Sequence, residues 1–523
     1  MIRSDLSLME LSWMFGPSLT FRQTKFLLLG FLNPTSQLMF GSGLSRNGSL
    51  LAMKMVNSAC IWISRALCSF TFCKPTRFSE WRFPMKVKSL ILIGLVAVSS
   101  VASAQSRFIM RYTESEPLSS FLARYQLKLE RTVANRPIHA VIDPLRRNPA
   151  ALIQQISDET DDDVSIEQDQ IVRLPILNFR QPEVSGERAL TMAFKNTRPT
   201  NFFGSSLPGG FVQQLAGYQT NAVPSWGVHG GGSGTVAVID TGVDGTHTSL
   251  SRVVVSGIDL IDRRGTGSEL TGLPTNILAI INPTTIPLLQ RDFNHLSNGH
   301  APAWERSVRL NSSFSQIPIG LGHGTMVAGA IHLVAPTARI LPIRAFGQNG
   351  QGRLFHVIEG IHLAEQRGAK VVNLSLNTYT YSSEMERTVN DVSDRGIILV
   401  ASAGNDGLTN PLSYPARHEK VTSVASVDAR NVRSRFSNAG VDVTWVAAPG
   451  EGLYLPFPGQ RYAGGWGTSF AAPLVSGMAA KMLSRKPDAT YSDLQSALGR
   501  SSFNPDVNLG MGTLNVFNSV DGF

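Results

Sequence analysis

Apolar residues in the second half of the chain follow two patterns, short continuous runs and stripes at helical spacing. The runs Thr235–Ile239, Val371–Leu376 and Gly396–Ala401 contain no charge, which is typical of strands buried on both faces. The stretches Leu354–Arg367 and Ser469–Ser484 carry apolar residues three and four positions apart, as amphipathic helices do. Continuous strands that alternate with helices predict a mostly parallel sheet covered on both faces, a three-layer α/β/α fold.

A smaller α+β unit is predicted for residues 105–175. Arg107–Tyr112 and Val164–Asp169 have the alternation of strands, whereas Leu118–Glu130 and Asn148–Ser157 have helical spacing. Residues 176–215 show little periodicity and are rich in Pro, Asn, Gly and Ser, so we interpret them as a linker or processing segment. The remaining residues, 216–523, then form the large domain.

The first 104 residues differ from the rest. Residues 1–84 contain all three cysteines and no sustained period. From Met85 a basic segment, an apolar run and the small residues Ala102-Ser103-Ala104 follow in the order of a secretory signal. We therefore expect translation to start at Met85, with 1–84 a mis-called upstream extension and 85–104 a signal peptide. The alternative is an internal signal anchor behind a genuine N-terminal tail.

Export predicts a secreted protein, either extracellular or periplasmic, whose mature chain has no cysteine. No later stretch is long and apolar enough for a membrane span, so we expect no anchor in the mature form. The net charge of +9 is concentrated in the first 104 residues, which hold 11 basic and 3 acidic side chains. The rest holds 36 basic and 35 acidic side chains, so a nucleic-acid partner has no electrostatic support.

Three short motifs carry candidate chemistry: Asp240-Thr241-Gly242, His323-Gly324-Thr325 and Gly467-Thr468-Ser469. In an Asp/His/Ser triad the serine attacks a carbonyl, the histidine transfers the proton, and the aspartate orients the imidazole. Asp240 ends a predicted strand, and Ser469 begins a predicted helix whose N–H groups favour a developing oxyanion. A plain N-cap serine is the alternative for Ser469, but three motifs in the chain order Asp, His, Ser favour catalysis.

A fourth motif, Ala403-Gly404-Asn405, follows a predicted strand, and the Asn405 amide is a candidate oxyanion donor rather than a turn residue. Asp-Thr-Gly also occurs in aspartic proteases, but this chain has one copy and would need to dimerise. His295 and His300 near Asp292 have loose spacing for a metal site, so we predict none.

With these motifs in place, residues 216–523 resemble the subtilisin family of serine proteases, the subtilases. Val371–Leu376 is similar to the family's substrate-pocket strand, and Gly350-Gln351-Gly352 to the strand that pairs with the substrate backbone. Tyr414-Pro415-Ala416, Phe436-Ser437, Ala448-Pro449-Gly450 and Gly512–Val516 are similar to later landmarks. The resemblance implies a serine endopeptidase acting on proteins or peptides, with substrate-binding residues Gly350, Gln351, Gly352, Ser375, Leu376, Asn377, Ala403 and Gly404.

Residues 107–175 resemble the family's propeptide, which assists folding and then occupies the active site. This resemblance implies a zymogen that cleaves itself and has its own propeptide as an intramolecular inhibitor. The alternative function is a catalytically silent relative that only binds peptides.

Three departures from the family pattern qualify the resemblance. Asn377 stands where glycine is usual, and its side chain would narrow or polarise the primary specificity pocket. Ser249 stands where many family members have an aspartate ligand of their tight calcium site, so we expect no calcium at that site. We expect no required cofactor, although calcium could bind at another site. Asp240 and His323 are 83 residues apart, which implies an insertion around residues 257–320.

Overall fold

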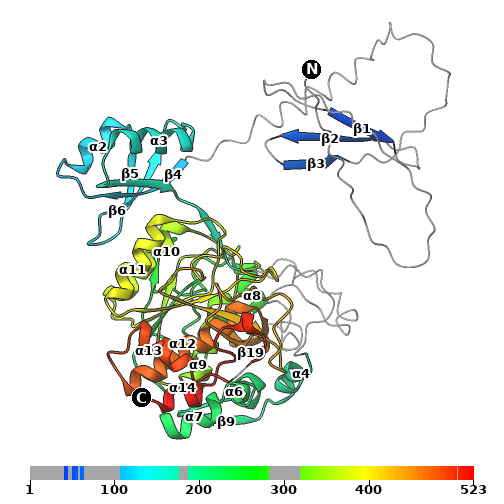
Figure 1. Cartoon of the computed structure of the whole chain (residues 1–523). Helices are drawn as coiled ribbons and strands as arrows, with labels where there is room; N and C mark the ends of the chain where they lie inside the picture. The colour runs from blue at the N-terminus through cyan, green and yellow to red at the C-terminus, as the bar shows by residue number, and fades with distance from the viewer. Residues whose placement is uncertain are drawn as a thin grey trace, which may run out of the picture. The chain divides into compact units, whose positions relative to one another are not determined.

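The computed structural model describes residues 40–44, 50–56, 59–63, 106–175, 187–281, 318–502 and 504–523. The chain divides into two compact units, residues 1–100 and 101–523. The first unit contains an antiparallel sheet of β1 (Phe40–Leu44), β2 (Leu50–Val56) and β3 (Ala59–Ile63), in that order (Figure 1). The predicted signal at 85–104 lies outside the described residues, and the assignment of 1–84 as an extension stays a prediction.

The second unit begins with an N-terminal subdomain, residues 106–175. Its antiparallel sheet has the order β5-β6-β4-β7, and two helices cover one face around the buried Phe108, Phe121 and Ile156. The elements are β4 (Ser106–Tyr112), α2 (Leu118–Arg124), β5 (Lys128–Thr132), β6 (Ile138–Asp143), α3 (Pro149–Glu159) and β7 (Val164–Gln168).

The predicted helix Leu118–Glu130 is wrong in its second half, because α2 ends at Arg124 and residues 128–132 form β5. Gln126 has a φ of 54°, a left-handed conformation that ends the helix. Leu129, which fitted the helical spacing, is 41% exposed on the strand instead of lying in the core.

Residues 187–229 lead into the large domain, and most of them are ordered structure rather than the predicted linker. Leu190, Phe202, Leu207 and Phe211 are buried in the same core as the helices of the large domain. The elements are α4 (Glu187–Lys195), β9 (Pro199–Phe202), β10 (Ser205–Pro208), α5 (Gly209–Val212), α6 (Leu215–Gln219) and α7 (Ala222–His229). Only residues 176–186 of the predicted linker lie outside the described part of the chain.

The large domain is built on a parallel sheet of seven strands in the order β12-β13-β11-β15-β16-β17-β18. Every residue of β11, β15, β16, β17 and β18 is buried, which explains their uninterrupted apolar runs. The strands are β11 (Thr235–Asp240), β12 (Ile258–Asp259), β13 (Arg339–Arg344), β15 (Val371–Leu374), β16 (Ile398–Ser402), β17 (Val421–Val427) and β18 (Val446–Pro449).

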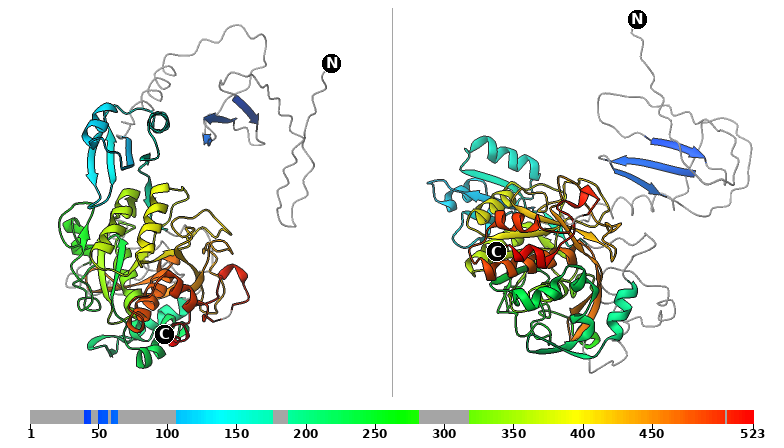
Figure 2. Two further views of the ribbon diagram at one scale, coloured as in Figure 1. Left: turned by 60° about the vertical axis from the view of Figure 1, so that its left-hand side comes forward. Right: turned by 60° about the horizontal axis from the view of Figure 1, so that its bottom comes forward.

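Helices cover both faces of this sheet (Figures 1 and 2). Val236 and Val238 of β11 pack with α9 (His323–Val334) and α12 (Thr468–Arg485), whereas Ala237 and Ile239 pack with α10 (Leu354–Gln366) and α11 (Ser383–Asp394). The three-layer α/β/α prediction is therefore confirmed. The remaining elements are β8 (Ile171–Arg173), α8 (Thr275–Ile281), β14 (Gln351–Arg353), β19 (Glu451–Phe457), β20 (Arg461–Trp466), α13 (Tyr491–Leu498), the short 3₁₀ turn Val507–Leu509 and α14 (Val516–Asp521).

The N-terminal subdomain lies against α10 and α11 of the large domain (Figure 1). Ile109, Ile138 and Ala140, on the sheet face without helices of its own, are buried in the same core as those two helices. Within the described ranges no helix is long and apolar enough to cross a membrane.

Candidate active site

Asp240 is the last residue of β11, and its side chain is fully buried at the carboxyl edge of the sheet. The backbone N–H groups of Ala345 and Phe346 donate to its carbonyl oxygen at 2.9 and 3.1 Å. The N–H of Thr241 donates to its carboxylate Oδ1 at 2.7 Å. These bonds fix the carboxylate at the edge where active sites gather in parallel sheets.

His323 begins α9 directly against this edge. Its Nδ1 lies 2.8 Å from Oδ1 and 2.9 Å from Oδ2 of Asp240. Because an ionised carboxylate only accepts hydrogen bonds, Nδ1 carries the proton and Nε2 is left as an acceptor. A Cβ on Gly324 would lie 2.1 Å from the carbonyl oxygen of Gly242, so only glycine lets the helix start this close to the Asp-Thr-Gly turn.

Ser469 is the second residue of α12, which packs against α9. The ring of its neighbour Phe470 lies 5.6 Å from the His323 imidazole, centre to centre. Ser469 is buried, and its Oγ makes no hydrogen bond to any residue of the described part of the chain. The structure thus joins Asp240 to His323 and sets Ser469 on the adjoining helix, without a hydrogen bond between Oγ and Nε2. Such contacts are often long until a substrate tightens them.

Thr468, which was not among the predicted site residues, orients the side chain of Asn405. Its Oδ1 accepts from the backbone N–H of Thr468 at 2.9 Å and from the Thr468 hydroxyl at 2.8 Å. Because both donors engage the amide oxygen, the amide nitrogen is directed away from them, and it donates to the carbonyl of Pro175. Thr468 stands beside Ser469 in the Gly-Thr-Ser motif, which is the signal that could have identified it.

Residues 171–175 of the subdomain, which we call the docked strand, lie on the predicted substrate-binding segments. β8 pairs antiparallel with β14, with Arg173 opposite Gln351 and Val172 opposite Gly352. Leu174 donates its N–H to the Gly350 carbonyl at 3.0 Å. On the other side the N–H of Asn377 donates to the Arg173 carbonyl at 3.2 Å.

The other predicted substrate residues contact neighbouring groups of the large domain. The hydroxyl of Ser375 donates to the Ser469 carbonyl at 2.9 Å. Leu376 is fully buried, and the Ala403 carbonyl accepts from the Asn438 amide at 3.1 Å. A Cβ on Gly404 would lie 3.0 Å from the Asn377 amide nitrogen, so these two predicted residues are adjacent.

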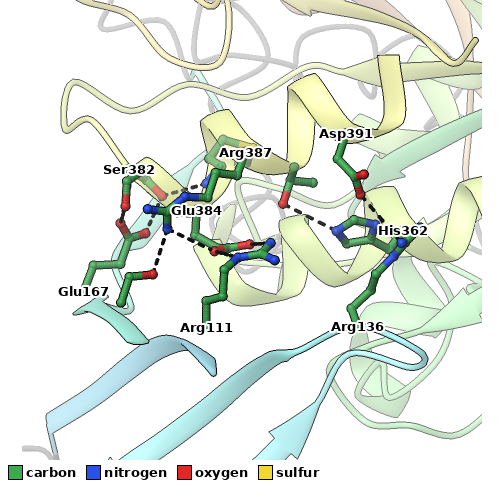
Figure 3. A network of polar contacts seen from close by, with 12 residues as sticks. Arg111, Arg136, Glu167, His362, Ser382, Glu384, Arg387 and Asp391 are labelled. Atoms are coloured by element: carbon green, nitrogen blue, oxygen red, sulfur yellow. Dashed lines mark hydrogen bonds and ion pairs between the residues drawn. The ribbon is translucent and has the colours of Figure 1, made fainter. Parts of the chain in front are cut away.

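Ion pairs connect the subdomain to α10 and α11. Figure 3 shows Arg111 reaching the carboxylate of Glu384, with two hydrogen bonds of 2.9 and 2.7 Å. Arg136 contacts Glu365 at 2.9 Å, and Arg131 contacts Glu359 at 2.5 Å. Glu384 is buried, and the arginine that the subdomain supplies is its nearer cationic partner, with Arg387 of α11 at 3.7 Å.

Two subdomain carboxylates cap helices of the large domain. Glu167 accepts from the Ser383 N–H and hydroxyl, both at 3.0 Å, at the start of α11 (Figure 3). Asp169 accepts from the Phe355 N–H at 3.0 Å, at the start of α10. Negative side chains are favourable at helix N-termini, so the charge pattern of the subdomain matches the helices beneath it.

Comparison with known proteins agrees with this geometry. The model of the subtilase family matches residues 231–516, more than half of the chain, and that range includes Asp240, His323, Asn405 and Ser469. The chain belongs to the subtilase family. This is a family of serine endopeptidases, so the family prediction is confirmed.

Several relatives of this subtilase are curated proteins. It is 31% identical to thermitase from Thermoactinomyces vulgaris over 53% of its own length and 85% of that protein. It is 33% identical to a thermophilic serine proteinase of Bacillus sp. (strain AK1), a match that spans 50% of this chain and 55% of that one. An alkaline protease of Shouchella clausii matches at 26% identity over 77% of this chain and 89% of its own length.

A solved structure shows the same fold. Fervidolysin from Fervidobacterium pennivorans, described as a keratinolytic enzyme related to subtilisin, has a TM-score of 0.58 and 21% sequence identity. The match covers 80% of this subtilase and 61% of fervidolysin.

The calcium position that the resemblance implied does not fit a cation here. Ser249 is buried, and its hydroxyl forms a 2.5 Å hydrogen bond with the Tyr462 hydroxyl. Both groups are neutral, and neither supplies the carboxylate oxygens that calcium prefers. The part of the chain that the structure describes contains no group of three or more His, Cys, Asp or Glu side chains that could hold a metal ion. The loose candidates Asp292, His295 and His300 lie outside the described residues.

Proposed function

We propose that this subtilase is a secreted serine endopeptidase, made as a precursor that its own N-terminal subdomain inhibits. The observation that carries the proposal is the docked strand, whose Pro175 carbonyl accepts a hydrogen bond from Asn405. A substrate held as an added strand presents its backbone carbonyls in this manner. Residues 171–175 therefore occupy the position that we propose for the acyl side of a substrate.

In the proposed reaction, Ser469 Oγ attacks the substrate carbonyl carbon while His323 Nε2 takes the hydroxyl proton. Asp240 holds Nδ1–H and stabilises the imidazolium. The oxyanion accepts hydrogen bonds from Asn405 Nδ2 and the Ser469 backbone N–H. As the carbon–nitrogen bond breaks, His323 returns the proton to the leaving amine and an ester on Ser469 remains. Water then hydrolyses the ester, with His323 passing its proton back to Ser469.

The contacts of the subdomain support an inhibitory role. The docked strand is joined to the large domain by backbone hydrogen bonds, and the subdomain behind it by the ion pairs and helix caps described above. We propose that the precursor cleaves itself after Pro175 and that residues 106–175 then act as its inhibitor. The signal at 85–104 supports export of this precursor, to an extracellular or periplasmic location.

The proposed substrates are proteins and peptides bound mainly through their backbone, which predicts broad and weakly selective cleavage. A requirement for one unique substrate sequence would contradict this. We propose no required cofactor, no nucleic-acid partner and no membrane anchor in the mature form.

The test is mass spectrometry of protein expressed from Met85, with and without a fluorophosphonate, beside a Ser469→Ala precursor. We expect an adduct on Ser469 in a chain that begins at Ile176, while the Ser469→Ala protein keeps its N-terminal subdomain. An unlabelled chain that still begins near Gln105 would instead favour the catalytically silent relative. Activity that is highest in acid and insensitive to the reagent would favour an aspartic protease.

A further inference from the structure

A second carboxylate lies behind the Asp240–His323 pair. Glu269 lies in the loop between β12 and α8, within the predicted insertion, and is 0% exposed. Its Oε1 accepts from the Thr241 hydroxyl at 2.5 Å and from the Gly322 N–H at 2.7 Å. Its Oε2 accepts from the Thr325 N–H at 3.2 Å and from the Thr325 hydroxyl.

These four donors come from both triad motifs. Thr241 follows Asp240 in the chain, and its hydroxyl also accepts the N–H of Gly324, the residue after His323, at 3.0 Å. Gly322 precedes His323, and Thr325 lies in the first turn of α9. The carboxylate of Glu269 therefore ties the end of β11 to the start of α9, the two elements whose spacing sets the contact between Asp240 and His323.

The loop that carries Glu269 is pressed against the Asp-Thr-Gly turn. The N–H of Val243 donates to the Gly267 carbonyl at 3.0 Å. A Cβ on Gly242 would lie 2.7 Å from the Gly267 carbonyl oxygen and 2.8 Å from the Glu269 nitrogen. Because the φ of Gly242 is +101°, this close approach also depends on glycine.

The burial of Glu269 needs compensation, because an ionised carboxylate without partners is strongly disfavoured in a protein interior. No basic side chain of the described residues pairs with it, so the four donors and the N-terminus of α9 supply that compensation. Burial raises the pKa of Glu269 to about 7, while the threonine hydroxyls oppose the rise. The titratable groups that face it are Asp240 and, beyond it, His323; Asp244 directs its carboxylate to Thr246 and Gly459 instead.

We propose that Glu269 is a positioning residue of the triad, which fixes the separation of Asp240 and His323 through Thr241, Gly322 and Thr325. The inference rests on the proposed proteolytic function. Glu269 touches neither the docked strand nor Ser469, so its loss changes kcat and leaves KM nearly unchanged.

The test compares Glu269→Gln with the parent, using the mature enzyme and active-site titration by a fluorophosphonate. We expect kcat to fall by up to about 100-fold while KM stays nearly unchanged, because misplacement of a catalytic group by about 1 Å can cost that much. Asp428→Asn is the matched control, because Asp428 is a buried carboxylate that accepts backbone N–H groups at 2.8 and 3.0 Å away from both motifs. An unchanged kcat in Glu269→Gln would overturn the inference.

A second pair of variants tests the inference if Glu269→Gln does not fold. Thr325→Val removes the hydroxyl that reaches Glu269 and keeps the shape, and Thr325→Ser restores the hydroxyl. We expect kcat to fall in the first and recover in the second, and equal values in both would overturn the inference. A parent enzyme that the fluorophosphonate does not label would refute the proposed function itself, so the two failures are distinguishable.

Discussion

Lys481 gives the clearest quantitative prediction about stability. Its side chain lies in α12 and is 0% exposed, and its amine donates to the Gly230 carbonyl in the loop before β11. Burial lowers the pKa of the Lys481 amine from its ordinary value of 10.5 to about 8. The folded protein therefore holds this proton less tightly than the unfolded chain does.

The sign and size of the effect follow from that difference. Between pH 8 and 10.5 the unfolded chain binds more protons, so stability rises with pH across this window. A pKa difference of 10.5 − 8 = 2.5 corresponds to about 3 kcal/mol. Below pH 8 the full cost of burying the charge is present, and above pH 10.5 it is absent. In Lys481→Met the cost is absent at every pH.

The assay is thermal or denaturant unfolding in a Ser469→Ala background, which prevents self-digestion, at pH 7 and at pH 10.5. The difference in unfolding free energy between Lys481→Met and its parent should shift by about 3 kcal/mol between the two pH values, in favour of the variant at pH 7. The hydrogen bond to Gly230 is lost at both pH values, so it cancels in this comparison. Roughly 3–4 °C in Tm is the corresponding change for a chain of this size.

Lys486→Met is the matched control from the end of the same helix. Lys486 is partly exposed and its pKa is raised by a hydrogen bond to Asp493, so its contribution has the opposite sign and fades only at higher pH. A shift of the same size in both variants, or no shift in Lys481→Met, would refute the reasoning from burial.

Three further predictions concern the site and its inhibition. Asn405→Ala should lower kcat by ~10²–10³, the cost of losing such a donor in subtilisin itself, with KM little changed in steady-state kinetics. Thr468→Val should lower kcat less, because the Asn405 amide loses the Thr468 hydroxyl but keeps the backbone N–H at 2.9 Å, and Thr468→Ser should restore kcat; equal rates in both would contradict that role. Arg111→Met leaves the buried Glu384 with only the more distant Arg387, at 3.7 Å, and we expect inhibition in the cleaved precursor to weaken by about 2 kcal/mol, or ~30-fold. The lag between cleavage and activity should then shorten, and an unchanged lag would count against the interface.

The parts of the fold that the sequence predicted well are those that local pattern decides. The strands of the central sheet are buried on both faces, so their apolar runs admit few other structures. The prediction that the helix from Leu118 continues to Glu130 was wrong, because Gln126 takes a left-handed conformation that ends the helix. The spacing of apolar residues does not reveal such a conformation. Residues 187–212 were missed because the burial of Leu190 and Phe202 depends on the large domain and not on their own spacing.

The site residues also divide into those that short motifs predicted and those that only the folded structure reveals. Asp240, His323, Ser469 and Asn405 stand in short motifs, and the structure brings Asp240 and His323 into contact. Glu269 has no motif around it and lies 28 residues from Thr241 and 53 from Gly322, so only the folded loop brings it to the triad. Long-range contacts of buried polar groups cannot be read from a single sequence, because their partners are fixed by packing.

The docked strand ends in Pro175, which lacks the backbone N–H that other residues could donate to the substrate-binding segments. Arg173 pairs antiparallel with Asn377, so Pro175 falls opposite Ser375, two residues further along both segments. Hydrogen-bonded pairs recur at every second residue of an antiparallel ladder, and proline has no N–H to donate to the Ser375 carbonyl. A peptide with any other residue there gains a bond that the docked strand lacks. The docked strand of the proposed precursor therefore makes one backbone hydrogen bond fewer than a substrate strand can, so its hold on the site depends on the ion pairs and helix caps behind it.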